Sequence, residues 1–168
     1  MGIDIRGSCS AAGCRFAIIV SRFNEEITEG LLQGARQALA DAAVRDEDVT
    51  ILRVPGAFEI PVAALRAAGT ARFDAVICIG CLIKGDTMHF EYIASAACQG
   101  IADAAAATGV PMALGVLTTL TEEQALERSV DGPGNKGREA AEAAVEMATL
   151  FRELGGLKAV GYRNRSDA

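Results

Sequence analysis

The stretch from Ala75 to Ile83, AVICIGCLI, decides the fold class of this chain. It is apolar throughout apart from one glycine, and no unbroken apolar run in the chain is longer. A run without polar alternation is typical of a strand that is buried on both faces of a sheet. A membrane-spanning helix needs about 20 apolar residues, so this run is too short to be one. We therefore expect a central strand here and no membrane protein.

Three shorter apolar runs flank the central one, and long helical sequences separate them. They are RFAIIV at residues 15–20, VTILRV at residues 49–54 and MALGVL at residues 112–117. Alternation of strands and helices predicts a parallel sheet with helices on both of its faces. We therefore expect the α/β class, as a three-layer αβα sandwich with a four-stranded parallel sheet.

The helical sequences carry recognisable start and stop signals. Asn24 is the expected N-cap of the first helix, and the second begins near Phe58. A third helix is predicted over residues 89–108, where Gly109 and Pro111 end it. Thr121, with a glutamine three residues later, predicts a capping box for a short helix. A final helix follows a glycine-rich loop.

Length, composition and charge narrow the class of protein. The chain has 168 residues, of which 51% are hydrophobic, so it has enough apolar surface to fold as one domain over residues 1–168. We expect residues 1–14 and 157–168 to be flexible tails. The formal net charge is -6, which argues against nucleic acid as a partner. The first residues show no secretory signal, so we expect a cytoplasmic protein.

The five cysteines and the single histidine offer little for metal or redox chemistry. An odd cysteine count in a reducing compartment argues against a disulfide framework, and one histidine is a poor basis for a metal site. Cys78 and Cys81 form a CxxC motif, which invites a redox interpretation. The pair lies within a predicted strand, where odd spacing points the two thiols to opposite faces. Buried free thiols are the favoured interpretation.

In open parallel sheets, ligands bind beyond the carboxyl ends of the strands. Polar and aromatic residues that are scarce elsewhere in the chain gather in the segments that follow the predicted strands. These segments are residues 21–24, 55–59, 84–89 and 118–119, and they place Phe23, Phe58, Phe90 and Tyr92 at or beside strand ends. The dinucleotide fingerprint GxGxxG follows none of the strands, and a P-loop is absent from the sequence.

The segment after the central strand predicts an anion site. Gly85, Asp86 and Thr87 precede a helix, where free backbone N–H groups meet the positive end of the helix dipole. The alternative is that Asp86 or Thr87 simply caps the helix. His89 follows, and histidine can act as a general acid or base near neutral pH. The alternative is a structural histidine at a helix start.

Three further charged residues carry two interpretations each. Arg128 and Lys136 flank the glycine-rich loop, and the planar fork of arginine suits a phosphate group. Two solvated charges are the alternative. Glu59 could bind hydroxyl or N–H groups of a ligand, or it could be a carboxylate that the dipole of its helix favours.

Five sequence blocks, taken together, resemble those of the 6,7-dimethyl-8-ribityllumazine synthase family. They occur in the family's order and spacing, and IKGxTxHFEY is the most specific part. The blocks are SRFNEEITEGLLQGA (21–35), VPGAFEIP (54–61), IGCLIKGDTMHFEYI (79–93), GVLTTLTEEQALER (115–128) and GNKGREAAEAAVEM (134–147).

This resemblance implies a flavodoxin-like fold and the penultimate step of riboflavin biosynthesis. The family condenses 5-amino-6-(D-ribitylamino)uracil with 3,4-dihydroxy-2-butanone 4-phosphate to give the lumazine, phosphate and water. It uses no metal and no organic cofactor. Its active sites lie between neighbouring subunits of a homopentamer, and some members assemble twelve pentamers into a shell. Riboflavin synthase is a further partner that the resemblance implies.

The resemblance also implies a role for each matching residue. Seven residues would contact the pyrimidine and its ribityl chain, with Phe23 stacking on the ring: Phe23, Ala57, Phe58, Glu59, Cys81, Leu82 and Ile83. Asp86 and Thr87 would present N–H groups to the butanone phosphate, and His89 would transfer protons. From the neighbouring subunit, Leu114 would cover the ring, Arg128 would clamp the phosphate and Lys136 would lie nearby.

Three positions depart from the commonest pattern of the family. Leu114 stands where many members have Phe, Asp86 where a small neutral residue is frequent, and Gly132 where many shell-forming members have Lys. Gly132 leaves assembly beyond the pentamer open, while Leu114 and Asp86 leave room for a second kind of protein, a riboflavin- or lumazine-binding relative with little turnover. A shell without activity and a flavodoxin-like electron carrier are further alternatives.

Overall fold

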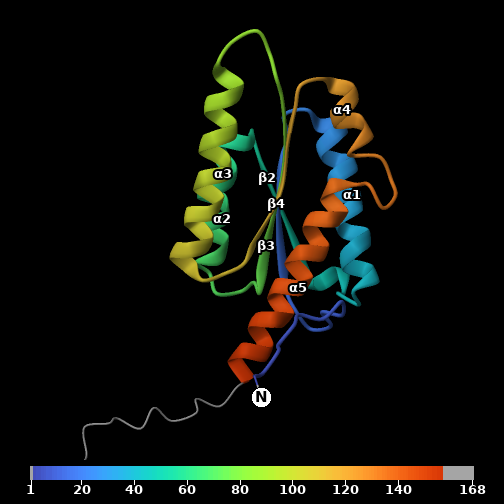
Figure 1. Ribbon diagram of the computed structural model, residues 1–168, viewed down its shortest axis with the longest axis vertical. Helices are drawn as coiled ribbons and strands as arrows, with labels where there is room; N and C mark the ends of the chain where they lie inside the picture. Colours follow the sequence, from blue (N-terminus) through green and yellow to red (C-terminus); the bar gives the residue numbers. More distant parts are fainter. Residues whose placement is uncertain (1, 157–168) are drawn as a thin grey trace, which may run out of the picture.

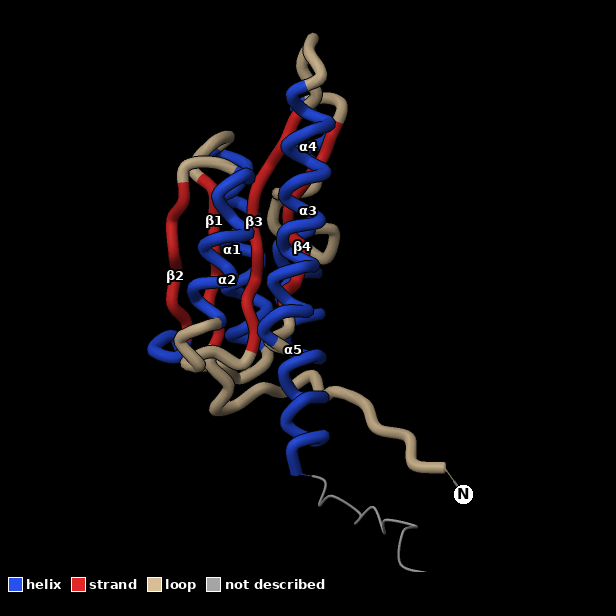
Figure 2. The backbone as a smooth tube through the Cα atoms, turned by 90° about the vertical axis from the view of Figure 1, so that its left-hand side faces the viewer, coloured by secondary structure: helices blue, strands red, loops and turns tan. Residues whose placement is uncertain are grey.

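The computed structural model describes residues 2–156 and contains one sheet of four parallel strands. The strands are β1 (Phe16–Ser21), β2 (Val49–Val54), β3 (Ala75–Ile83) and β4 (Met112–Thr119). Their order across the sheet is β2-β1-β3-β4, which Figure 2 shows from one side. This is the order of flavodoxin-like folds, and it confirms the predicted fold class. The predicted tail at 157–168 lies outside the described residues.

Within residues 2–156, five α-helices cover the sheet in two layers. They are α1 (Glu25–Asp41), α2 (Ile60–Ala68), α3 (His89–Thr108), α4 (Glu122–Glu127) and α5 (Lys136–Gly156), with short 3-10 turns η1 (Asp46–Asp48) and η2 (Ala57–Glu59). Helices α2 and α3 lie on one face of the sheet, and α1, α4 and α5 lie on the other (Figure 1). The molecule is therefore the predicted three-layer sandwich.

The two central strands explain why their sequences are apolar without alternation. All of β1 is buried, and so is β3 from Ala75 to Cys81. In β1, Phe16, Ile18 and Val20 pack with the layer of α1 and α5, while Ala17 and Ile19 pack with the layer of α2 and α3. Each face of these strands has its own helix layer, so both sets of side chains leave water.

The carboxyl ends of all four strands meet at one end of the sheet, because the strands are parallel. The long connection from β3 to α3 and the short helix α4 lie at this end, which is the upper end in Figure 1. The capping box predicted for α4 forms in part. The Gln124 N–H donates to Thr121 Oγ1 at 3.2 Å, and Gln124 Oε1 accepts the Leu120 N–H at 3.0 Å.

The sequence predicts a flexible tail over residues 1–14, and most of residues 2–14 are exposed, but two hydrogen bonds tie this segment to the rest of the fold. The Ser8 N–H donates to Thr149 Oγ1 of α5 at 2.7 Å, and the Ala11 N–H donates to the Ala42 carbonyl at 2.8 Å. Cys14 is fully buried. Within residues 2–156, no helix is both long enough and apolar enough to cross a membrane.

Candidate active site

The strand order reverses its direction between β1 and β3, because β1 leads outward to β2 and β3 leads to β4 on the other side. Ligands of doubly wound sheets bind at the carboxyl end of such a switch point. A cleft of ≈ 560 Å³ opens at this place. The cleft has the size of a small-molecule site.

The segments that follow β1, β2 and β3 line this cleft together. Its lining residues are Phe23, Pro55, Gly56, Ala57, Phe58, Glu59, Cys81, Leu82, Ile83, Gly85, Thr87, His89, Phe90 and Ile93. The structure thus brings together nine of the site residues that the sequence predicted, from three separate parts of the chain. Asp86 lies in the same loop between two lining residues and is exposed.

Hydrogen bonds beyond the end of β1 place Phe23 beside the second segment. The Arg22 N–H donates to the Val54 carbonyl at 2.9 Å, and the Phe23 N–H donates to the Pro55 carbonyl at 3.2 Å. The segments that follow β1 and β2 therefore stay hydrogen-bonded to each other past the last residues of these strands. The Phe23 side chain is 69% exposed in this single subunit, and the ring is free to stack on a planar ligand.

Asn24 has a different role from the helix cap that the sequence suggested. It occupies the N-cap position of α1, but its side chain makes no capping bond. Instead, Asn24 Nδ2 donates to the Cys81 carbonyl at 3.0 Å and so ties the end of β1 to the end of β3. Its φ of 57° is left-handed, a conformation that asparagine tolerates better than most residues. Sequence reasoning missed this tie, since the local sequence at Asn24 predicts only a helix cap.

Glu59 closes the turn after β2. Glu59 Oε2 accepts the Gly56 N–H at 2.9 Å, which holds the carboxylate at the start of η2 and α2. A carboxylate has two oxygens and several lone pairs, so this bond leaves acceptor capacity for hydroxyl groups of a ligand. Glu59 is half-buried in the cleft wall beside Phe58, which is itself 59% exposed.

The loop after β3 presents backbone to the cleft rather than capping side chains. Helix α3 begins at His89, its N-cap position is Met88, and no side chain caps it. The alternative that Asp86 or Thr87 caps this helix is therefore wrong. Uncapped N–H groups at the start of a long helix favour an anion. His89 lies in this first turn, exposed to solvent and lining the cleft.

An ion pair fixes the base of the same loop. Lys84 Nζ lies 3.2 Å from Glu91 Oε1, and the Lys84 N–H donates to the Thr119 carbonyl at 2.9 Å. The backbone N–H of Glu91 itself, and then Lys84, hold the pKa of the Glu91 carboxyl below its usual value. Both charged groups are partly exposed and compensate each other.

The two cysteines of the CxxC motif are buried thiols on opposite faces of the sheet. Cys78 packs with the layer of α2 and α3, and Cys81 packs with the layer of α1 and α5. Burial raises the pKa of the Cys78 thiol to about 12 and that of the Cys81 thiol to about 11. Both groups are therefore protonated near neutral pH, which argues against a thiolate nucleophile or a redox pair.

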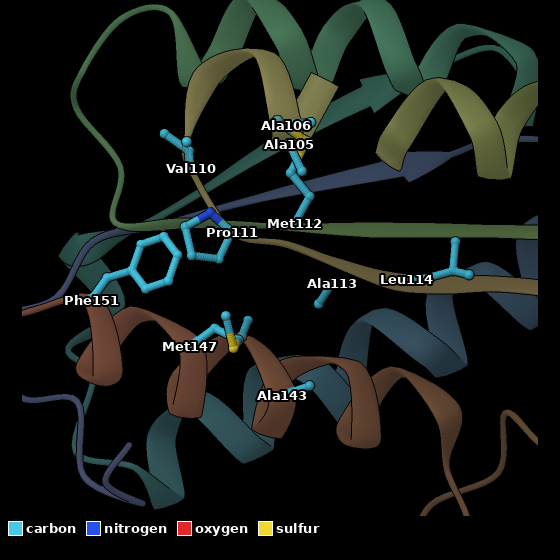
Figure 3. A pocket seen from close by; sticks show the side chains of 12 residues that line it. Ala105, Ala106, Val110, Pro111, Met112, Ala113, Leu114, Ala143, Met147 and Phe151 are labelled. Carbon is cyan, nitrogen blue, oxygen red and sulfur yellow. The ribbon is translucent and has the colours of Figure 1, made fainter. Parts of the chain in front are cut away.

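Three predicted site residues lie outside this cleft. Leu114 is on the edge strand β4 and is 53% exposed, at one end of an apolar groove between α3 and α5 (Figure 3). Arg128 and Lys136 lie at the two ends of the loop between α4 and α5. Arg128 Nη1 donates to the Gln124 carbonyl at 2.8 Å, and Lys136 Nζ pairs with Glu139 at 2.5 Å. None of the three lines the cleft at the switch point.

The chemistry of the cleft suits an organic substrate with a planar ring and an anionic group. Aromatic and aliphatic side chains line it, with one carboxylate and one histidine. Among residues 2–156, no group of three or more His, Cys, Asp or Glu side chains lies together in a way that could hold a metal ion. The protein therefore has a flavodoxin-like α/β fold with a candidate small-molecule site at the switch point of its sheet.

Comparison with known proteins identifies the family. The family of 6,7-dimethyl-8-ribityllumazine synthase matches residues 13–152. A relative from Syntrophus aciditrophicus (strain SB), "6,7-dimethyl-8-ribityllumazine synthase", is 49% identical over 148 residues, which cover 88% of this chain and 96% of the relative. The chain belongs to the 6,7-dimethyl-8-ribityllumazine synthase family. It is an enzyme, a transferase of riboflavin biosynthesis.

Proposed function

We propose that the cleft at the switch point condenses 5-amino-6-(D-ribitylamino)uracil with 3,4-dihydroxy-2-butanone 4-phosphate. The product is 6,7-dimethyl-8-ribityllumazine, with release of phosphate and water. The observation that supports this assignment is the meeting of three distant segments, which carry the family's motifs, around a single cleft of ≈ 560 Å³. The same cleft also holds the single histidine of the chain.

The pyrimidine would lie against Phe23, with the ring of Phe23 stacked on it. The backbone from Cys81 to Ile83 would bind the polar edge of the ring, because β3 ends there and Asn24 holds the Cys81 carbonyl in place. Ala57 and Phe58 would enclose the ribityl chain. Glu59 would accept hydrogen bonds from ribityl hydroxyls, since Gly56 already orients its carboxylate.

The butanone phosphate would lie at the start of α3. Backbone N–H groups near Asp86 and Thr87 would donate to its oxygens, which the helix dipole also favours. A negative side chain at Asp86 opposes an anion, so a cation is needed nearby. We assign this role to Arg128 of the neighbouring subunit, with Lys136 of that subunit close to it, because arginine binds phosphate through two parallel hydrogen bonds.

The reaction needs proton transfers and orientation rather than an activated nucleophile. The aromatic amine attacks the ketone carbonyl, the adduct loses water to form an imine, phosphate leaves, and the ring closes with loss of a second water. His89 would carry protons between these groups, since it lies within the cleft next to the proposed phosphate position. Holding both substrates together supplies much of the acceleration.

A single subunit leaves the site open, and a second subunit would complete it. Exposed apolar side chains gather at Phe23 and Phe58 around the cleft and at Leu114, Met147 and Phe151 along the groove of β4 (Figure 3). Large exposed apolar surfaces of this kind mark interfaces. We propose a homopentamer in which the β4 side of one subunit covers the cleft of the next, and Leu114 covers the pyrimidine.

Two further assignments follow from the proposed reaction. The product lumazine is consumed by riboflavin synthase, which we propose as a protein partner. We also propose that the enzyme works in the cytoplasm, because a reducing compartment suits its free cysteines.

The proposed function is tested by mixing the purified protein with both substrates and following the lumazine chromophore. We expect a rate that is proportional to enzyme and lies above the slow uncatalysed background. Arg128→Ala should raise the KM for the butanone phosphate by about tenfold to a hundredfold, as loss of a charged hydrogen-bonding partner does. Bound riboflavin or lumazine without turnover would instead identify a flavin-binding relative and overturn the proposal.

A further inference from the structure

Asn135 joins the loop that carries Arg128 to helix α1. Its side chain is 1% exposed, and Nδ2 donates to the carbonyls of Gly30 at 3.0 Å, Ser129 at 2.9 Å and Val130 at 3.1 Å. One of these carbonyls belongs to α1, and the other two directly follow Arg128. A single buried amide thus connects the loop to a helix that lies about a hundred residues away in sequence.

The other end of the same amide caps α5. Asn135 Oδ1 accepts the N–H of Gly137 at 2.9 Å and the N–H of Arg138 at 3.0 Å. The two sets of partners fix the orientation of the amide, because three acceptors face its NH₂ group and two donors face its oxygen. If the amide oxygen and nitrogen were exchanged, the oxygen would face three carbonyl oxygens and the NH₂ group would face two N–H groups. Asn135 therefore has one arrangement in this fold.

Glycines allow the close approach on which these bonds depend. A Cβ atom at Gly34 would lie 2.1 Å from Asn135 Oδ1, and one at Gly30 would lie 2.5 Å from the Ser129 carbonyl oxygen. At the start of α5, a Cβ at Gly137 would lie 1.9 Å from the Leu31 carbonyl oxygen. The backbones of α1, the loop and α5 are thus in direct contact around the Asn135 side chain.

The backbone of this loop connects Asn135 to Arg128. The Lys136 N–H donates to the Arg128 carbonyl at 2.9 Å, and the Asn135 N–H donates to the Gly132 carbonyl at 3.2 Å. The loop therefore closes on itself, with Arg128 and Asn135 at its base. Any shift of Asn135 relative to α1 would move the Arg128 backbone with it.

We propose that Asn135 is a positioning residue, which sets where the Arg128 guanidinium meets the substrate phosphate in the cleft of the neighbouring subunit. This inference rests on the phosphate role proposed for Arg128. Helix α1 begins directly after the cleft residues of its own subunit, at Glu25. Asn135 fixes this loop to α1. It therefore keeps Arg128, which acts in the neighbouring cleft, at a constant distance from the cleft of its own subunit.

The variant Asn135→Ser tests this role. Serine still caps a helix, but its hydroxyl is too short to reach the three carbonyls. We expect the KM for the butanone phosphate to rise about tenfold, because small displacements of an orienting group are costly. The KM for the ribitylaminouracil should change less than about twofold, since no pyrimidine contact is altered. Equal rises in both KM values would overturn the proposal.

Thr149→Val is the matched control for lost stability. Thr149 is also buried on α5 and bonded through its side chain, to the Ser8 N–H and the Val145 carbonyl, but it lies at the far end of the helix. We expect this variant to lower Tm with neither KM changed. A rise in the KM for the butanone phosphate in Thr149→Val would show that general loosening of α5 suffices, and would overturn a specific role for Asn135.

The double variant Arg128→Ala/Asn135→Ser separates action through Arg128 from independent action. If Asn135 acts by placing Arg128, the double variant should have the same KM for the butanone phosphate as Arg128→Ala alone. Effects that multiply would overturn the proposal. If Arg128→Ala leaves that KM unchanged while the enzyme turns over, the phosphate role of Arg128 is wrong and the Asn135 proposal falls with it.

Asn135→Asp is the second variant, in case the serine variant does not fold. It keeps the size and the cap, but it replaces the donor NH₂ by an acceptor that faces three carbonyls. Because it adds a negative charge, its KM for the butanone phosphate is measured at low and at high salt. We expect KM to be raised at both salt concentrations, because a displaced loop does not depend on screening. A rise in KM that high salt abolishes would be an effect of the added charge and would overturn the proposal.

Discussion

His89 combines a position in the cleft with chemistry that few side chains offer. It lies in the first turn of α3, exposed to solvent, and it lines the cleft with Thr87 and Phe90. Histidine exchanges protons near neutral pH, and the proposed reaction needs several such transfers. The solvent that reaches His89 can also carry protons. We therefore expect His89 to accelerate a reaction that remains possible without it.

We expect His89→Ala to lower kcat by about a hundredfold, at the low end of what general acid–base catalysis contributes, and to leave measurable turnover. Lumazine formation at saturating substrate measures this change. Met88→Ala is the control, because Met88 is the exposed neighbour of His89 and does not line the cleft. An unchanged kcat in purified His89→Ala would remove the role assigned to His89.

The sequence predicts side chains at this scale better than it predicts ties between backbone segments. Phe23 and His89 are rare residue types in this chain, Glu59 directly follows an aromatic residue at a strand end, and all three line the cleft. The bond from Asn24 to the Cys81 carbonyl joins segments whose neighbourhood depends on the strand order. Local signals at Asn24 favour a helix cap, and only the tertiary fold offers the competing acceptor.

At the scale of elements, the contact between α1 and α5 depends on the absence of side chains. Gly137 is buried in the first turn of α5 and faces the backbone of α1. A Cβ atom there would lie 1.9 Å from the Leu31 carbonyl oxygen, and backbone cannot move aside as a flexible side chain can. The two helices approach more closely here than any other residue type allows.

We expect Gly137→Ala to lower the free energy of unfolding by about 2–3 kcal/mol, as overpacking in a tight core does. Chemical unfolding of the purified variant measures this loss. Gly155→Ala on the same helix is the control. Gly155 is exposed with nothing within 4 Å of the added Cβ, so alanine there should raise stability by about 0.5–1 kcal/mol. Equal effects of the two substitutions would contradict this account of the α1–α5 contact.

The sequence predicts the presence and the order of strands best where both faces of a strand are buried. The runs at β1 and β3 are apolar because helix layers cover both faces, and their bounds match the predicted ones within two residues. The prediction ends β4 at Leu117, whereas the strand continues to Thr119 through pairing of Ile83 with Thr119. Polar residues at a strand end resemble a loop in the sequence, and only the partner strand shows that pairing continues.

At the scale of the whole molecule, the proposed site is divided between two surfaces. Phe23, Glu59 and His89 lie at the switch point, while Leu114 and Arg128 lie on the β4 and α4–α5 side of the subunit. Leu114, Arg128 and Lys136 do not line the cleft that holds His89 in the same chain. A closed ring of identical subunits would bring the two surfaces together at every interface, because each subunit presents both surfaces. The sequence predicts each half, and neither half alone reveals how the subunits are arranged.

Subunit mixing tests this division directly. His89→Ala and Arg128→Ala subunits are unfolded together and refolded at equal amounts. Lumazine formation is then measured at a butanone phosphate concentration far below the wild-type KM, where each variant alone should have only a small fraction of the wild-type rate. If His89 and Arg128 of one site come from different subunits, random mixing places both native residues in about a quarter of the sites of a cyclic oligomer, and about a quarter of the wild-type rate returns. Each single variant mixed with the double variant is the control, since no site then regains both residues. Light scattering verifies that the mixed oligomers form. Failure to regain activity in such oligomers would mean that His89 and Arg128 of each site belong to the same chain.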